Sequence, residues 1–174
     1  EGSVAPDPVS AGYTLAFGDD FDGDSLDWRT WLLKMPWGPD VVVNGETQYF
    51  VDAFANAATK LPYEPFRMES DPEAEDGRVL RITAIPTPPE LLARANGQPY
   101  LSGVITTRSK PGGDKRYGYV EMRAKVASGS GLLSTFYLFQ SGGNQYEIDI
   151  LEYVGSEPDG ATQNYHYRDG FRYA

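Results

Sequence analysis

The chain has 174 residues and carries 15 Lys and Arg against 25 Asp and Glu, a formal net charge of −10. An acidic surface repels phosphates and anionic lipid headgroups, so we expect neither nucleic acid nor membrane as a partner. Hydrophobic residues make up 40% of the chain, enough for a packed core, and no apolar run approaches the roughly 20 residues of a membrane span.

The composition favours strands separated by turns, with 19 Gly, 13 Pro and 13% aromatic residues. Strands are predicted at residues 13–17, 48–51, 79–84, 103–108, 119–126, 132–139, 146–153 and 162–167. Segments 79–84 and 119–126 alternate apolar and polar side chains, the pattern of a half-buried strand. Segment 132–139 is apolar at nearly every position, which is typical of a strand covered on both faces. Many short strands predict an all-β sandwich.

Two segments are predicted to be connections. Thr87 to Glu90 forms a capping-box pattern with proline at the first helical position, and Asn96 with Gly97 provides a stop signal, so a helix of about two turns is expected. Residues 60–77 hold three prolines and six acidic residues and are predicted to be an exposed loop. Length predicts one domain over residues 1–174, with a flexible lead at residues 1–12.

Residues 146–153 place three acids in an apolar strand. In a regular strand Glu147 and Asp149 share a face and Glu152 lies on the opposite one. A β-bulge near Ile150 and Leu151 would return Glu152 to the face of the other acids. The glutamates would then be ~13 Å apart at Cα, and inward-leaning carboxyl groups could approach the ~5–5.5 Å of a retaining glycosidase. An ordinary half-exposed strand and a calcium site remain open alternatives.

The acid strand and five further segments resemble glycoside hydrolase family 16, in its laminarinase-like branch. The acids match the motif E-x-D-x-x-E, and the other segments follow in family order at residues 17–23, 44–50, 102–107, 117–125 and 131–139. The resemblance implies a β-jelly-roll sandwich of two antiparallel sheets, similar to concanavalin A, with a polysaccharide cleft. It also implies retaining endo-hydrolysis of β-1,3 or mixed β-1,3/1,4 glucan.

The resemblance further implies roles for the residues of the cleft. Glu147 would be the nucleophile and Glu152 the general acid/base, with Asp149 helping to keep Glu152 protonated. Tyr137 falls where the family has a sugar-stacking aromatic, with a core tyrosine as the alternative. His166 matches a histidine near the acid/base, with a structural histidine as the alternative.

Residues of the N-terminal half complete the implied site. Trp37, Asn44 and Tyr49 are candidates for binding sugar beyond the cleavage point. Leu133 replaces a usual tryptophan, which weakens the sugar platform expected there. Asp20 lies near the family's structural calcium site. The resemblance implies no metal or other cofactor in catalysis, and calcium only as a structural ion.

The chain is shorter than family members, so we expect the closing strands of the jelly roll, its C-terminal third, to be absent. A second chain or fragment could supply them. Three alternatives to a glucan hydrolase stay open: a non-hydrolytic carbohydrate-binding module, a transglycosylase, and a galactan hydrolase of the agarase or carrageenase type. The polymeric substrate predicts a secreted protein.

Overall fold

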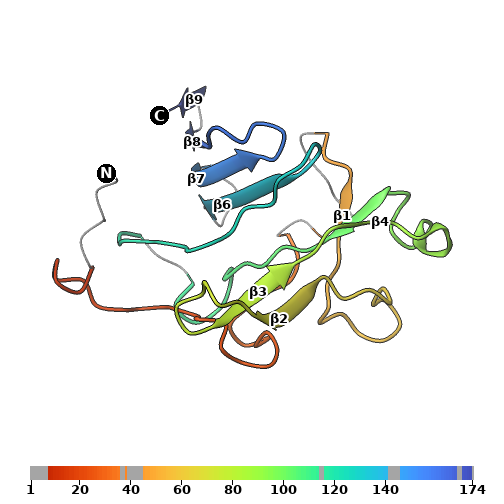
Figure 1. Ribbon diagram of the computed structural model, residues 1–174, viewed down its shortest axis with the longest axis horizontal. Coiled ribbons are helices and arrows are strands. Elements are labelled where there is room, and N and C mark those ends of the chain that lie inside the picture. The colour runs from red at the N-terminus through yellow and green to blue at the C-terminus, as the bar shows by residue number, and fades with distance from the viewer. Residues whose placement is uncertain are drawn as a thin grey trace. The chain divides into compact units, whose positions relative to one another are not determined.

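A computed structural model describes residues 8–35, 38, 45–113, 116–140, 146–167 and 170–173, the last four by their backbone alone (Figure 1). The chain divides into two compact units, Glu1–Gly118 and Tyr119–Ala174. The regular elements are β1 (Gln48–Phe50), β2 (Phe66–Ser70), β3 (Arg78–Ile82), β4 (Ile85–Pro86), the 3₁₀ helix η1 (Pro89–Leu91), β5 (Tyr100–Ser102), β6 (Leu133–Phe139), β7 (Glu147–Val154), β8 (Thr162–Tyr167) and β9 (Gly170–Tyr173). The described residues include no apolar helix long enough to cross a bilayer.

The first unit contains two small sheets and an apolar core. Strand β5 lies between β1, which runs parallel to it, and β4, which runs antiparallel. Strands β2 and β3 form a separate antiparallel pair (Figure 1). The core is one cluster of buried side chains, made of Val51, Leu61, Leu91, Ala95 and Leu101. Because Leu91 and Ala95 follow β4, the connection between β4 and β5 contributes directly to this core.

The predicted two-turn helix is shorter in the structure. Only Pro89–Leu91 is helical, as a single 3₁₀ turn, and its N-cap residue makes no side-chain capping bond. The Thr87 hydroxyl donates instead to the carbonyl of Gln98, 2.7 Å away, so the capping box does not form. The predicted stop is present, since Asn96 and Gly97 have φ values of 55° and 77°.

The prediction of an exposed loop over residues 60–77 is wrong, because β2 lies inside it. Phe66 is buried, and its ring lies so close to Gly103 that an added Cβ there would be 2.7 Å from ring atoms. Glu69 of β2 forms an ion pair with Arg81 of β3. The prolines and most of the acids flank this strand, so the composition of the whole segment conceals its five-residue pattern.

Three other predicted strands do not form ladders among the described residues. Segments 13–17 and 119–126 belong to none of the sheets, and segment 103–108 contributes only an isolated bridge between Thr106 and Leu32. Val120 and Met122, expected on a buried face, are exposed. Alternation makes a segment suitable for a strand, but a ladder also needs a partner whose register the sequence pattern does not reveal.

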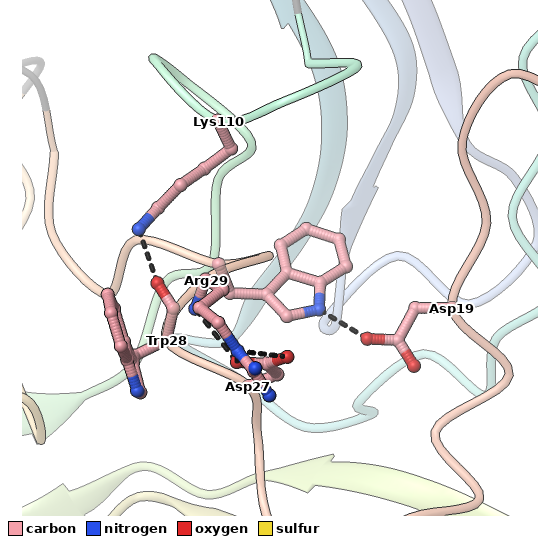
Figure 2. Close-up of polar contacts among 6 residues, drawn as sticks. Asp19, Asp27, Trp28, Arg29 and Lys110 are labelled. Carbon is pink, nitrogen blue, oxygen red and sulfur yellow. Dashed lines mark hydrogen bonds and ion pairs between the residues drawn. The ribbon is translucent and has the colours of Figure 1, made fainter.

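Side chains organise the segment that follows residues 13–17. Trp31 donates from its indole nitrogen to Asp19 at 2.6 Å, and the same carboxylate accepts the backbone N–H of Phe21 at 2.9 Å. Lys110 donates to the carbonyl oxygen of Trp28, and its ammonium group lies 5.9 Å from the centre of the Trp28 ring (Figure 2). Local polar contacts thus take the place of the expected strand pairing.

The second unit contains one antiparallel sheet in the order β6-β7-β8-β9, with β6, β7 and β8 visible side by side in Figure 1. The prediction that segment 132–139 is covered on both faces is wrong. Among the described strands β6 is at an edge of this sheet, and Leu133, Leu138 and Phe139 are exposed. The start of β6 is fixed by close backbone contacts, since Gly155 exchanges hydrogen bonds with Leu132 and Gly129.

Candidate active site

Strand β7 carries the three acids and contains the predicted β-bulge. Asp149 is opposite Tyr137 on β6, whereas Leu151 is opposite Phe136, so Ile150 is the additional residue on β7. The register against β8 shifts between the same acids, Asp149 and Glu152. The extra residue reverses the alternation once and brings Glu152 onto the face of Glu147 and Asp149.

Pairing across the strands defines what lies on this acid face. Residues directly opposite each other in antiparallel strands share a face, with Cβ atoms about 4.5–5.5 Å apart. Three rows cross β6, β7 and β8: Phe139, Glu147 and His166; Tyr137, Asp149 and Asn164; and Thr135, Glu152 and Thr162. The structure therefore brings Tyr137 and His166 together with the three acids, as predicted.

Asp149 is the most buried acid of the site, with 4% of its surface exposed. The imidazole Nε2 of His166 lies 2.8 Å from its Oδ2. A proton on Nε2 makes the ring a hydrogen-bond donor, and protonation of both ring nitrogens makes the contact an ion pair. Burial of the Asp149 carboxylate is compensated by this contact.

Glu147 is half-buried beside Asp149. Burial is the largest cause that raises the pKa of Glu147, and the negative charge of Asp149 is the second. The His166 charge lowers the pKa, while a hydrogen bond with Asp149, which requires one shared proton, and the charge of Glu152 raise it. The net direction is upward from the ordinary value of 4.5, so Glu147 keeps its proton more readily than an exposed glutamate.

Glu152 is held by two residues of β8 that the sequence analysis did not single out. Asn164 donates from Nδ2 to Oε2 of Glu152, and the Thr162 hydroxyl donates to the same oxygen at 3.4 Å. The sequence contained a pattern that could have identified both residues, since Thr162, Asn164 and His166 follow one another at intervals of two residues in a predicted strand. Once His166 is placed in the site, strand parity places the other two on its face.

One group of acid and histidine side chains could hold a metal ion. The ligand atoms of Glu147, Asp149 and His166 all lie within 4.8 Å of one another. Two carboxylates and an imidazole suit a transition-metal ion better than calcium. Asp20, expected near a structural calcium site, is exposed and belongs to no such group within the described ranges.

The remaining sugar-binding candidates belong to the first unit. Trp37 and Asn44 lie outside the described residues. Tyr49 packs against the apolar core cluster and lines a cavity of about 190 Å³, with Lys34 and Asp52 among its other lining residues. Its assignment as a substrate-binding residue stays a prediction.

An antiparallel sheet with two glutamates and an aspartate on one face has the features of a glycoside-cleaving site. The family model for glycosyl hydrolases family 16 matches residues 82–171, just over half of the chain, and the chain belongs to this family. Membership and the all-β structure together confirm the predicted jelly-roll fold class.

Three relatives of known name are similar to the chain. It is 32% identical over 161 residues to the endo-1,3-1,4-beta-glycanase EglC of Rhizobium meliloti (strain 1021), covering 88% of this chain and 32% of that protein. It is 30% identical over 158 residues to ExsH, an endo-1,3-1,4-beta-glycanase of the same organism, covering 86% and 32%. It is 25% identical over 182 residues to the glucan endo-1,3-beta-glucosidase A1 of Niallia circulans, covering 92% and 23%. The chain spans about a third of the length of the first two, and no solved structure matches it significantly.

Proposed function

We propose that this chain carries the catalytic site of a retaining endo-β-glucanase that hydrolyses β-1,3 or mixed β-1,3/1,4 glucan. The bulge in β7 carries the proposal, because without it Glu152 would lie on the face opposite Glu147. The names of the relatives, two endo-1,3-1,4-beta-glycanases and one glucan endo-1,3-beta-glucosidase, support the substrate class.

In the first step the ionised carboxylate of Glu147 attacks the anomeric carbon of the glucan. The bond between that carbon and the glycosidic oxygen breaks, and Glu152 gives its proton to the departing oxygen. The products are a glycosyl ester on Glu147, a free sugar end and a Glu152 carboxylate.

In the second step a water molecule attacks the same anomeric carbon. The Glu152 carboxylate takes a proton from this water, the ester bond breaks, and Glu147 returns to its ionised form. Two inversions at one carbon give net retention of configuration.

The surroundings of Glu147 affect the pH at which it can attack. Its raised pKa means that a larger fraction is protonated, and therefore inactive as a nucleophile, at mildly acidic pH. The His166 charge lowers the pKa and so favours the ionised form. We expect kcat/KM to decline on the acid side at a higher pH than an ordinary glutamate would give.

Paired substitutions test the roles of the two glutamates. Reducing-sugar release from laminarin and mixed-linkage glucan should fall by about 10⁴-fold or more in Glu147→Ala. Azide should restore cleavage of an aryl glycoside in this variant with inverted product, because it attacks from the vacated side. Glu152→Ala should keep the first step on substrates with good leaving groups, and azide rescue there should give retained product.

The same assays separate the alternatives. Oligosaccharide binding without any product from laminarin, mixed-linkage glucan, agarose or carrageenan would refute hydrolysis and favour a carbohydrate-binding module. Products longer than the donor at high acceptor concentration would identify a transglycosylase. Cleavage restricted to agarose or carrageenan would identify a galactan hydrolase.

We further propose two properties. The first depends on this function: the protein acts outside the cell, because its polymeric substrate is there, and a fractionation assay of the native source tests this. The second rests on the family resemblance alone: a structural calcium ion stabilises the fold, and an unchanged Tm on exchange between EDTA and calcium chloride would refute it.

A further inference from the structure

Strand β8 distinguishes the two carboxylate oxygens of Glu152. The Asn164 amide nitrogen and the Thr162 hydroxyl both donate to Oε2. An amide N–H can only donate, so Oε2 must act as an acceptor while this bond exists. A proton on Glu152 then belongs on Oε1.

The register of the sheet makes the contact with Asn164 diagonal. Asn164 is opposite Asp149, and Thr162 is opposite Glu152. The bond from Asn164 therefore draws the Glu152 carboxyl group along β7 toward the row of Asp149, which lies between Glu152 and Glu147. This direction reduces the gap of four strand positions between the two glutamates.

The burial of Asn164 is difficult to explain by stability alone. The residue is 8% exposed, and its Oδ1 is buried without a hydrogen-bond partner among the described residues. An unsatisfied buried acceptor costs about 1–3 kcal/mol. An apolar side chain of similar size would avoid that cost, so the bond from Nδ2 to Glu152 is the feature that accounts for an amide here.

We infer that Asn164, assisted by Thr162, is a positioning residue that assigns Oε2 of Glu152 as acceptor and Oε1 as the oxygen that transfers the proton. Oε1–H gives its proton to the departing glycosidic oxygen, and the Oε1 carboxylate oxygen later takes a proton from water. Both donors can remain on Oε2 in both steps, so the group does not need to rotate between them. This inference rests on the proposed function.

Leaving-group dependence provides the test. Asn164→Leu removes the donor at nearly constant volume, and we expect kcat/KM on glucan and on aryl glycosides with poor leaving groups to fall about 10- to 100-fold, the effect of one hydrogen bond to a charged group. The kcat/KM of the same variant on 2,4-dinitrophenyl laminaribioside reports the first step alone and should stay within about threefold of the native value, because this leaving group needs no proton. The kcat on this substrate should fall, because the second step still needs Glu152 as base. Its Tm should equal or exceed the native value.

Two further variants keep the test decisive. Asn164→Asp preserves the shape but replaces the donor by an acceptor, so it should show the same selective loss even if the leucine variant folds poorly. Gln140→Leu removes an exposed amide from the residue that follows β6 and should retain native activity.

Three outcomes would overturn the inference: equal losses on both leaving-group classes, no loss in either Asn164 variant, or, in both Asn164 variants, a loss that follows a fall in Tm. Glu152→Ala separates these from a failure of the proposed function. If Glu152→Ala shows no leaving-group selectivity, the assignment of the acid/base is itself wrong. If Glu152→Ala is selective and the Asn164 variants are not, only the role of Asn164 is refuted.

Discussion

The two compact units of this chain bury opposite kinds of side chain. The first unit buries an apolar cluster that includes Val51, Leu61 and Leu101. Among the described residues of the second unit, the buried side chains are those of Asp149 and Asn164, while Ile148 and Leu138 are exposed. Apolar burial stabilises a fold, whereas burial of polar groups costs free energy unless each is paired.

This difference indicates which buried residues stabilise the fold and which support catalysis. The interior of the first unit has the composition of an ordinary protein core. The buried polar side chains of the second unit, Asp149 and Asn164, lie on the acid face itself, beside Glu147 and Glu152. Substitutions in the two interiors should therefore separate loss of folding from loss of catalysis.

The largest effect on stability should come from the core of the first unit. Leu101 is fully buried in β5, so Leu101→Ala should reduce the free energy of unfolding by about 2–5 kcal/mol. Ile148→Ala, on the exposed face of β7, should change it by about 0.5 kcal/mol or less. Guanidinium unfolding measures both, and similar losses at the two positions would break the comparison.

Asp149→Asn should affect catalysis more than stability. We expect kcat/KM to fall about ten- to a thousandfold, equivalent to about 1.4–4 kcal/mol, because Asp149 acts through its contact with Glu147 and forms no bond to the substrate in the proposed mechanism. The free energy of unfolding should change by less than about 1 kcal/mol, since an amide of the same shape replaces the buried carboxylate.

Asp27→Asn is the matched control in the first unit. Asp27 is paired with Arg29 at 3.0 Å on the surface, as Figure 2 shows, so both activity and stability should stay close to native. A loss of several kcal/mol of stability in Asp149→Asn would show instead that Asp149 is structural.

Backbone packing should matter more than apolar packing in the second unit. A Cβ on Gly155 would lie 2.4 Å from the carbonyl oxygen of Gly129, and a backbone atom cannot move aside as a side-chain tip can. Gly155→Ala should cost about 1–3 kcal/mol. Gly160→Ala, with no atom within 4 Å, should be neutral or stabilising by about 0.4–1 kcal/mol. Thermal unfolding that ranks the two equally would contradict this account.

The smallest expected effect is the pH dependence of stability that comes from the titration of Glu147. Because its folded-state pKa is raised, Glu147 contributes stability that is fully present below its ordinary value of 4.5 and is lost as pH rises through the folded value. Glu147→Gln removes this titration. The Tm of the variant minus that of the native protein should therefore increase from pH 4 to pH 7, and a constant difference would show that Glu147 is not perturbed.

The acid strand was predictable from the sequence to the level of individual side chains. Glu147, Asp149 and Glu152 have a spacing that requires a bulge for one-sided chemistry, and the structure contains that bulge. Tyr137 and His166 were expected at the site from the family resemblance. For the acids themselves local alternation is sufficient, because each side chain's face depends only on its neighbours along the strand.

Features that depend on distant partners were not predictable in the same way. Phe66 belongs to a strand because β3 and Gly103 lie beside it, and its own segment is rich in proline and acids. Segment 119–126 alternates well but joins no ladder among the described strands. The bond from Asn164 to Glu152 depends on the register between β7 and β8, which a single sequence does not specify.

The bulge in β7 also accommodates one extra residue without changing the strand pairing on either side of it. Deletion of Ile150 would leave Glu147, Asp149 and Glu152 at strictly alternate positions, still on one face. The pairs of Phe136 with Leu151 and of Asp149 with Asn164 would then continue as an uninterrupted ladder. The strand can therefore gain or lose this one residue without turning a catalytic side chain away. The span between the two glutamates stays the same as well, because Glu147 and Glu152 remain opposite Phe139 and Thr135, four strand positions or about 13 Å apart at Cα, so the bulge absorbs the extra residue.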